Sequence, residues 1–194
     1  MGNYVGITGT PGTGKKTIAP LVASKMDLPC ISLYDQAVLS RLIERGDDDA
    51  EVDTFALGRF LAKYVSGPAL IHGHLLPYVL SGRELRKVAV LRCEPMALRR
   101  RLLARGYQPR KVVDNVEAEL IGVLSADSIT TFGSMKTGEF DTTASEPTAA
   151  AKAISDFLGG SREPSHGIDW TFRYGSAAKL RSLLSVRGTK LTST

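Results

Sequence analysis

The chain has 194 residues, of which 43% are hydrophobic and 23% are charged. This size and composition fit one globular domain and argue against a wholly disordered chain. The sequence contains no apolar run long enough to span a bilayer, and no basic and apolar leader precedes the first strand-like segment. We therefore expect a soluble, cytoplasmic protein that does not associate with membranes.

The net charge of +5 is concentrated toward the end of the chain. Residues 160–194 carry six Lys or Arg and two Asp or Glu, a balance of +4, which leaves +1 for residues 1–159. A second basic excess lies in residues 83–111, where ten Lys or Arg face two Glu. Such patches attract nucleotides, RNA or other polyanions, although a solvated basic surface is the simpler explanation for the tail.

Short apolar runs alternate with helical stretches, which predicts an α/β protein with a parallel sheet. The expected strands are residues 4–8, 29–33, 69–72, 88–91 and 139–142. The expected helices are residues 14–26, 35–45, 54–65, 95–105, one from about 109 into the 120s, and 147–158. In the long helix, we expect Val113, Val116, Leu120, Val123 and Leu124 to face inward.

The pattern indicates one doubly wound domain of five parallel strands over residues 1–159, followed by a basic tail over 160–194. Gly159 and Gly160 break the last core helix at this boundary. Within the tail, residues 177–186 are expected to form a short amphipathic helix with its leucines on one side. The two cysteines, Cys30 and Cys93, lie in apolar runs and are expected to be small buried hydrophobic residues.

A glycine-rich run, Gly9-Thr10-Pro11-Gly12-Thr13-Gly14-Lys15-Lys16-Thr17, lies between the first expected strand and the first expected helix. In such a P-loop, backbone N–H groups and the helix N-terminus hold phosphate oxygens, and the lysine reaches the terminal phosphates. Glycines are needed because a Cβ would block the close approach. The motif and its position predict a P-loop NTPase fold.

One position departs from the usual motif. Lys16 stands where Ser or Thr commonly binds Mg²⁺, and Thr17 follows one residue later. Either Lys16 points outward, with the metal held largely through water, or metal binding is weakened.

The expected third and fourth strands both end in polar side chains. Arg92 lies at the carboxyl end of the fourth strand, where ligands bind in open α/β sheets, although a salt bridge to a carboxylate is the alternative. Alternation places His72 and His74 on one side of the third strand. A zinc site is disfavoured because no Cys or carboxylate lies nearby in the sequence, so we expect no protein-bound metal.

At these residues the chain resembles the adenylate kinase isoenzyme 6 family, particularly its archaeal members. The resemblance rests on the P-loop, on Gly73-His74-Leu75, on Asp141-Thr142-Thr143 and on one longer pattern. That pattern is Val90-Leu91-Arg92 followed by Arg105-Gly106-Tyr107, Lys111, Asp114-Asn115 and Glu119. Together the four segments span about residues 4–158.

The resemblance implies a small P-loop kinase with short mobile segments. Residues 32–54 would be the monophosphate-binding segment and residues 104–114 the lid. Lys15 would hold the transferring phosphoryl group, and Arg105 would stand at the start of the lid and contact ATP. The rest of the P-loop would bind the ATP phosphates through Gly12, Thr13, Gly14, Lys16 and Thr17.

The family pattern is broken on the third strand. Members carry an acidic residue for the Mg²⁺ site, then a spacer, then a histidine that positions the attacking water. His72 stands in the place of the acid, whereas His74 retains the histidine. The expected catalytic residues are therefore Lys15 from the motif, Arg92 from the sheet edge, and Arg105 and His74 as the resemblance implies, and Mg²⁺ is expected to be carried by the nucleotide.

The monophosphate segment is also atypical. Asp35 stands at its start and is expected to bind the substrate, and Tyr34, Arg41 and Arg59 are candidates to contact AMP. The acidic run of residues 47–49, together with Glu51, is interpreted as a solvated loop rather than as a site.

The leading hypothesis is an adenylate kinase-like phosphotransferase that converts ATP and AMP into two ADP. The resemblance adds ATP hydrolysis, assembly of the small ribosomal subunit, and contacts with a ribosomal protein and rRNA. The alternatives are a catalytically weakened, nucleotide-binding assembly factor, favoured by Lys16 and His72, and another small-molecule P-loop kinase. We expect a monomer or a weak dimer.

Overall fold

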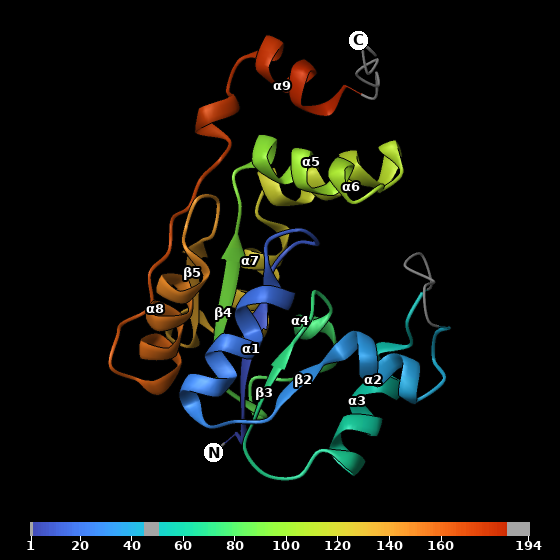
Figure 1. The fold of residues 1–194 in the computed structure, drawn as a ribbon, viewed down its shortest axis with the longest axis vertical. Helices are drawn as coiled ribbons and strands as arrows, with labels where there is room; N and C mark the ends of the chain where they lie inside the picture. The colour runs from blue at the N-terminus through green and yellow to red at the C-terminus, as the bar shows by residue number, and fades with distance from the viewer. Residues whose placement is uncertain (1, 45–50, 186–194) are drawn as a thin grey trace.

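The computed structural model describes residues 2–44 and 51–185, and its centre is a five-stranded sheet (Figure 1). All strand pairs are parallel, and the strand order is β2-β3-β1-β4-β5. The strands are β1 (Tyr4–Thr8), β2 (Cys30–Ser32), β3 (Ala69–His72), β4 (Leu85–Arg92) and β5 (Thr137–Asp141). This is the doubly wound parallel sheet expected from the sequence.

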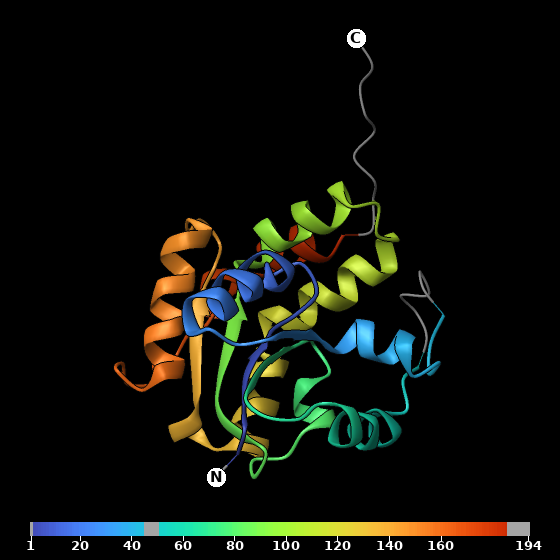
Figure 2. The same cartoon turned by 60° about the horizontal axis from the view of Figure 1, so that its bottom comes forward.

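Helices cover both faces of the sheet (Figures 1 and 2). In chain order they are α1 (Lys15–Met26), α2 (Leu33–Leu39), α3 (Thr54–Tyr64), α4 (Leu76–Val79), α5 (Pro95–Ala104), α6 (Pro109–Leu120), α7 (Val123–Phe132), α8 (Pro147–Gly159) and α9 (Ala177–Leu184). Two 3₁₀ turns, η1 (Ser134–Lys136) and η2 (Phe172–Tyr174), complete the regular structure of the described residues. None of the helices in the described ranges is long and apolar enough to cross a membrane.

Three apolar clusters hold these layers together. Alternation along β1 sends Val5 and Ile7 toward α1 and α8 and sends Tyr4 toward α3 and α4. The third cluster lies beyond the carboxyl ends of the strands, where α5 and α6 pack against Trp170, Tyr174 and Leu183 of the tail. The tail is therefore packed against the domain over the residues that the structure describes.

The prediction of one long helix from residue 109 is wrong, because two helices, α6 and α7, cover this part of the chain. Gly122 adopts a left-handed φ of 71° between α6 and α7, which turns the chain. The buried face also differs by one position, because Val112 is fully buried whereas Val113 is only half-buried. Val123 and Leu124 begin the second helix and line a cavity.

The strand β4 begins at Leu85 rather than at Val88. The charged residues Arg86 and Lys87 interrupt the apolar run, so the sequence pattern did not indicate the true start of this strand. The short helix α4 was not predicted either. Cys93 is buried as expected, but Cys30 is exposed. The reason is that β2 is the last strand at its edge of the sheet and has no strand beyond it.

Candidate nucleotide site

The phosphate loop, residues 9–14, connects the end of β1 to the start of α1 at the centre of the sheet. At Gly9 (φ 140°), a Cβ would lie 2.4 Å from the Leu91 carbonyl oxygen of the neighbouring strand. At Gly12 (φ 96°), it would lie 2.6 Å from the Leu98 side chain of α5. The loop can therefore pass this close to β4 and α5 only because these positions are glycines.

The N-terminus of α1 is built to face an anion. Its first turn contains no acidic residue, its N-cap is Gly14, which has no side chain to cap the free N–H groups, and its first two residues are Lys15 and Lys16. Two cations beside the positive end of a helix are unfavourable unless an anion compensates them. This arrangement is suited to a phosphate group.

The Lys15 ammonium turns back onto the loop, donating to the Gly9 carbonyl and to the Thr10 carbonyl at 3.0 Å. Burial lowers the pKa of Lys15 to about 7, the Glu119 carboxylate opposes that shift, and Arg105 and Lys16 add to it. An arriving phosphate would strengthen the charged form. Lys15 is therefore placed to respond to a phosphate at the loop.

Two adjoining cavities open from the phosphate loop. The larger, of about 650 Å³, is lined by Thr10, Pro11, Gly12, Gly14, Lys15, Lys16, Thr17, Tyr34, His74, Tyr78, Arg105, Tyr107, Lys111, Asn115, Ala118, Val123 and Leu124. The smaller, of about 290 Å³, is lined by Lys15, Lys16, Ser32, Leu33, Tyr34, Ala37, Ile43, Glu51, Val52, His72, Gly73, His74 and Leu75. Both cavities share Lys15, Lys16, Tyr34 and His74.

One wall of the larger cavity comes from the chain that connects α5 and α6. Arg105, the residue expected to contact ATP, caps the C-terminal end of α5 and lines the larger cavity. Thr13 is placed differently from the other loop residues, because its hydroxyl donates to the Thr10 carbonyl at 2.9 Å and it is fully buried. Thr13 therefore shapes the loop and lines neither cavity.

Of the residues expected to bind the acceptor, Tyr34 lines both cavities, whereas the other three lie outside them. Asp35, Arg41 and Arg59 are exposed, and the Arg59 guanidinium stacks over the Phe55 ring at 4.5 Å. The wall of the smaller cavity is instead mostly apolar, from Leu33, Ala37, Ile43, Val52 and Leu75. Hydrophobic periodicity alone could not separate these residues from ordinary core.

The acidic run was expected to be a solvated loop. Residues 47–49 lie outside the described residues. Glu51 is exposed, as expected, but it also lines the smaller cavity.

Both histidines of the third strand's end face the smaller cavity, and His74 also lines the larger one. His72 is buried at the end of β3, which lowers its pKa below the ordinary value. The charge of Lys15 lowers this pKa further, whereas Asp35 opposes the shift. His72 is consequently held in its neutral form at pH 7.

The donor set offers little for a protein-bound Mg²⁺. Lys16 and His72 provide no oxygen ligand, and Thr17 contributes one exposed hydroxyl at the larger cavity. Among the described residues, no group of three His, Cys, Asp or Glu could hold a metal ion. This chemistry suits a metal that arrives on nucleotide phosphates.

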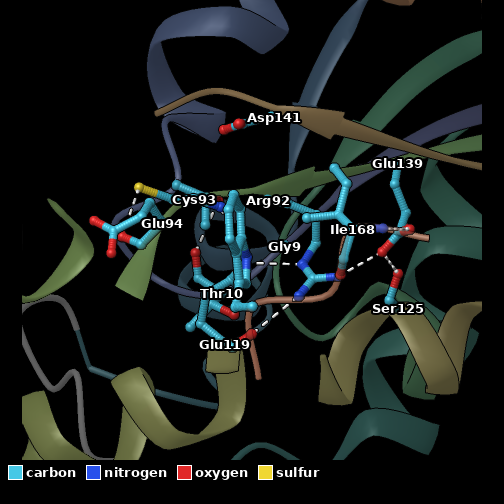
Figure 3. Close-up of polar contacts among 12 residues, drawn as sticks. Gly9, Thr10, Arg92, Cys93, Glu94, Glu119, Ser125, Glu139, Asp141 and Ile168 are labelled. Carbon is cyan, nitrogen blue, oxygen red and sulfur yellow. Dashed lines mark hydrogen bonds and ion pairs between the residues drawn. The ribbon is translucent and has the colours of Figure 1, made fainter. Parts of the chain in front are cut away.

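Arg92 lies in a buried ion-pair network rather than in a cavity (Figure 3). Its guanidinium is 3% exposed, donates to Glu119 Oε1 at 2.9 Å, and pairs with Glu139. Its remaining donors reach the Glu119 and Ile168 carbonyls at 3.0 and 3.1 Å. The expectation of a catalytic Arg92 is therefore replaced by the salt-bridge alternative.

Glu119 connects this ion-pair network to the phosphate loop by hydrogen bonds. Its carboxylate accepts hydrogen bonds from the Thr10 hydroxyl at 2.6 Å, the Cys93 N–H at 2.9 Å and the Trp170 indole N–H at 3.3 Å. Sequence reasoning included Glu119 only within a family pattern. No local signal in α6 distinguishes this buried carboxylate from a solvated one.

Two further residues support the loop from the β4–β5 side. The Thr142 hydroxyl lies 2.7 Å from the Thr13 carbonyl and 2.9 Å from the Arg92 carbonyl, so it can donate to either. Arg101 of α5 donates to the Thr142 and Thr143 carbonyls at 3.0 and 2.7 Å. The spacing of arginines in α5 did not reveal that Arg101 turns inward.

Comparison with known proteins supports a nucleotide kinase-like function. The family model described as the AAA domain matches residues 5–122. A "Putative adenylate kinase" of Halobacterium salinarum is 35% identical over 175 residues, covering 86% of this chain and 97% of that protein. One from Thermococcus onnurineus is 31% identical over 172 residues, covering 88% and 92%.

The fold is also found among solved structures. The shikimate kinase of Acinetobacter baumannii, in complex with shikimate, superposes with a TM-score of 0.57 at 12% identity, covering 84% of this chain and 96% of that chain. At this identity the likeness concerns the fold alone. It is the fold of P-loop kinases.

Proposed function

Because the chain belongs to the AAA domain family and to the archaeal proteins named "Putative adenylate kinase", we propose that it is an adenylate kinase-like phosphotransferase. The reaction transfers the terminal phosphoryl group of ATP to AMP and yields two ADP. The observation that carries the proposal is the pair of cavities that meet at Lys15 and Lys16. A phosphotransferase needs this arrangement, with donor and acceptor on two sides of one cationic centre.

The larger cavity is the ATP side in this proposal. Backbone N–H groups of the phosphate loop and the α1 N-terminus hold the phosphate oxygens, and Mg²⁺ enters as part of the nucleotide substrate. Lys15 holds the transferring group, and Arg105 neutralises charge from the lid side. The lid segment, 104–114, would exclude water so that AMP rather than water receives the phosphoryl group.

The smaller cavity is the acceptor side. Its apolar wall fits the planar base of a nucleoside monophosphate, and Lys15 and Lys16 at the junction of the cavities would bind the acceptor phosphate. In the reaction, a phosphate oxygen of AMP bonds to the terminal phosphorus of ATP, and the bond from that phosphorus to the ADP oxygen breaks. Tyr34 and His74 line both cavities and would border the reacting groups.

The direct test measures ADP formation by the purified protein from ATP and Mg²⁺, with and without AMP. AMP-dependent ADP formation would support the adenylate kinase. A panel of other nucleoside monophosphates and of small hydroxylated acceptors would identify a different kinase if AMP is inactive. ATP binding is measured alongside by calorimetry, so that absent turnover is distinguished from absent binding.

A second candidate is a nucleotide-binding factor with weak catalysis, which could assist assembly of the small ribosomal subunit as the resemblance implies. The observation that favours it is the neutral, buried His72 beside Lys15, where an acidic metal-associated group is expected. Tight ATP binding without ADP formation would support this candidate. Binding to a ribosomal protein or to rRNA would then be tested with and without nucleotide.

A further inference from the structure

We propose that the segment 165–174, here called the tail strap, supports the phosphate loop from outside the cavities, with Trp170 and Glu119 acting as positioning residues for that loop. The proposal rests on the proposed function to the extent that ATP phosphates occupy this loop. It assigns a role to a part of the chain that lies beyond α8 and lines neither cavity.

The tail strap first follows β5 at the edge of the sheet, where the Glu139 N–H donates to the Ser165 carbonyl at 2.7 Å. The Glu139 carboxylate then accepts the N–H groups of Gly167 and Ile168 at 2.7 and 3.0 Å. The Ile168 carbonyl in turn accepts from Arg92 at 3.1 Å. Figure 3 shows Ile168 and Glu139 beside the Arg92 guanidinium. The buried ion pair is therefore completed by backbone groups of the strap.

Trp170 connects the strap to the loop through a single carboxylate. Its indole N–H donates to Glu119 Oε1, while the other oxygen of Glu119 accepts from the Thr10 hydroxyl at 2.6 Å. Trp170 and Glu119 are 6% and 2% exposed, so water cannot readily replace either bond. Loss of the indole donor would leave Oε1 with the Arg92 and Cys93 donors alone and would break the hydrogen bond that ties the strap to the carboxylate behind Thr10.

A shared apolar cluster also joins the same two regions. Trp170 belongs to the cluster that contains Leu98 and Leu102. These two leucines abut Gly12 of the phosphate loop so closely that a Cβ there would lie 2.6 and 3.0 Å from them. Removal of the indole would therefore loosen the packing behind Gly12 as well as the hydrogen bond behind Thr10.

The charge balance gives the strap an electrostatic role. Two buried carboxylates, Glu119 and Glu139, share one guanidinium, and the Glu119 charge favours the protonated form of Lys15. The strap thus helps to orient the carboxylate that supports the cation at the phosphate site. By linkage, ATP binding stabilises the docked strap by the same free energy with which the docked strap favours ATP.

The chain contains one tryptophan, so the fluorescence of Trp170 reports on the strap without any label. We expect ATP to change this emission, saturating at the Kd that calorimetry gives for the same protein. Inorganic triphosphate is expected to produce the same change, because the coupling runs through the phosphate loop. Adenosine alone is expected to produce none.

Variants separate positioning from folding. Trp170→Ala and Glu119→Gln are expected to weaken ATP binding about fivefold or more, within the range typical of coupling between sites. Trp170→Phe keeps most of the packing and should recover part of the loss. The matched control is Phe172→Ala, because Phe172 lies in the same strap but is 92% exposed, and its Kd should stay within about twofold of wild type.

Glu119→Gln provides a readout that a merely structural role would not move. Four titratable or charged groups surround Lys15: Glu119 of α6, Arg105 at the end of α5, Lys16 of α1 and His72 of β3. Loss of the Glu119 charge lowers the pKa of Lys15, so the alkaline loss of ATP affinity should begin at a lower pH. All titrations are run well below the melting temperature of each variant.

The coupling is overturned if ATP binds the wild type while Trp170→Ala and Glu119→Gln keep its Kd. If those variants do not fold, a wild-type emission that ATP and triphosphate leave unchanged overturns it instead. ATP that fails to bind the wild type by calorimetry overturns the proposed function and the coupling together. Binding with normal affinity by the variants overturns the coupling alone.

Discussion

On the β4–β5 side of the phosphate loop, buried polar side chains are bonded to one another, whereas on the β2–β3 side several charged side chains are exposed. Glu119 and Arg92 belong to the first group, and each uses donors or acceptors from several elements. Asp35 and Arg59 belong to the second, and both are exposed. A buried charge needs full pairing, whereas an exposed one is solvated at little cost.

This difference indicates which half of the site is preorganised. The side with the buried network fixes the loop that would hold the donor phosphates, before any ligand arrives. The other side offers a cavity with a largely apolar wall, so in the proposed reaction the choice of acceptor would depend on the shape of this cavity and on the two lysines at its mouth. The following predictions test this contrast.

The largest effect is expected at the point where the two sides meet. Lys15→Ala removes the cation common to both cavities and should reduce phosphoryl transfer about 10³-fold or more, as loss of a charge-stabilising group does in this chemistry. The measurement is AMP-dependent ADP formation. A variant with near wild-type turnover and an unchanged melting temperature would remove the loop from the mechanism.

The next effect concerns stability on the buried side. Arg92→Ala leaves Glu119 and Glu139 without their shared cation and should lower the free energy of unfolding by about 3–5 kcal/mol. Urea denaturation measures this loss. Because an isolated buried carboxylate tends to bind a proton, the deficit should be smaller at pH 5 than at pH 8. A loss that is equal at both pH values would contradict the electrostatic explanation.

The pH dependence of ATP binding tests the burial of Lys15. Its pKa of about 7 means that the ammonium is present below pH 7 and is lost as pH rises. If phosphate binding requires the charged form, the Kd for ATP should increase above pH 7 by up to about tenfold per pH unit. The Lys15→Arg variant remains charged throughout this range, so its Kd should stay flat above pH 7.

A smaller effect is expected at His72, the last residue of β3 on the β2–β3 side of the loop. His72→Asp restores an oxygen ligand beside Lys15 and should raise Mg²⁺-dependent ATP hydrolysis several-fold. His72→Asn, which is polar but uncharged, serves as the control. Equal rates in all three proteins would place residue 72 outside the metal's surroundings.

The smallest effect is expected for a surface pair, which completes the contrast with Arg92. Lys152 and Asp156 lie one turn apart on α8 at 2.8 Å, with side chains 72% and 40% exposed. Lys152→Ala should change the free energy of unfolding by about 0.5 kcal/mol or less. A loss comparable to that of Arg92→Ala would show that burial does not decide the strength of these pairs.

The sequence by itself determined the architecture and the phosphate loop, because both depend on local patterns. Residues 69–72 form the expected strand, and residues 15–26 form the helix expected after the loop. Apolar alternation and the glycine spacing act over a few residues, so they can be recognised without knowing the neighbours. The short helix at 177–184 followed in the same way, with Leu183 buried as its pattern indicates.

Only the tertiary structure decided which polar residues support the loop and which face solvent. Thr10, Arg92, Glu119, Glu139 and Trp170 come from five separate parts of the chain, and they meet because a parallel sheet brings its strand ends to one edge. Conversely, Arg41 and Arg59 lie in the expected segment or beside it but are exposed and line neither cavity. A charged residue looks the same in a sequence whether it is solvated or buried, because the partners that make burial affordable are distant in the chain.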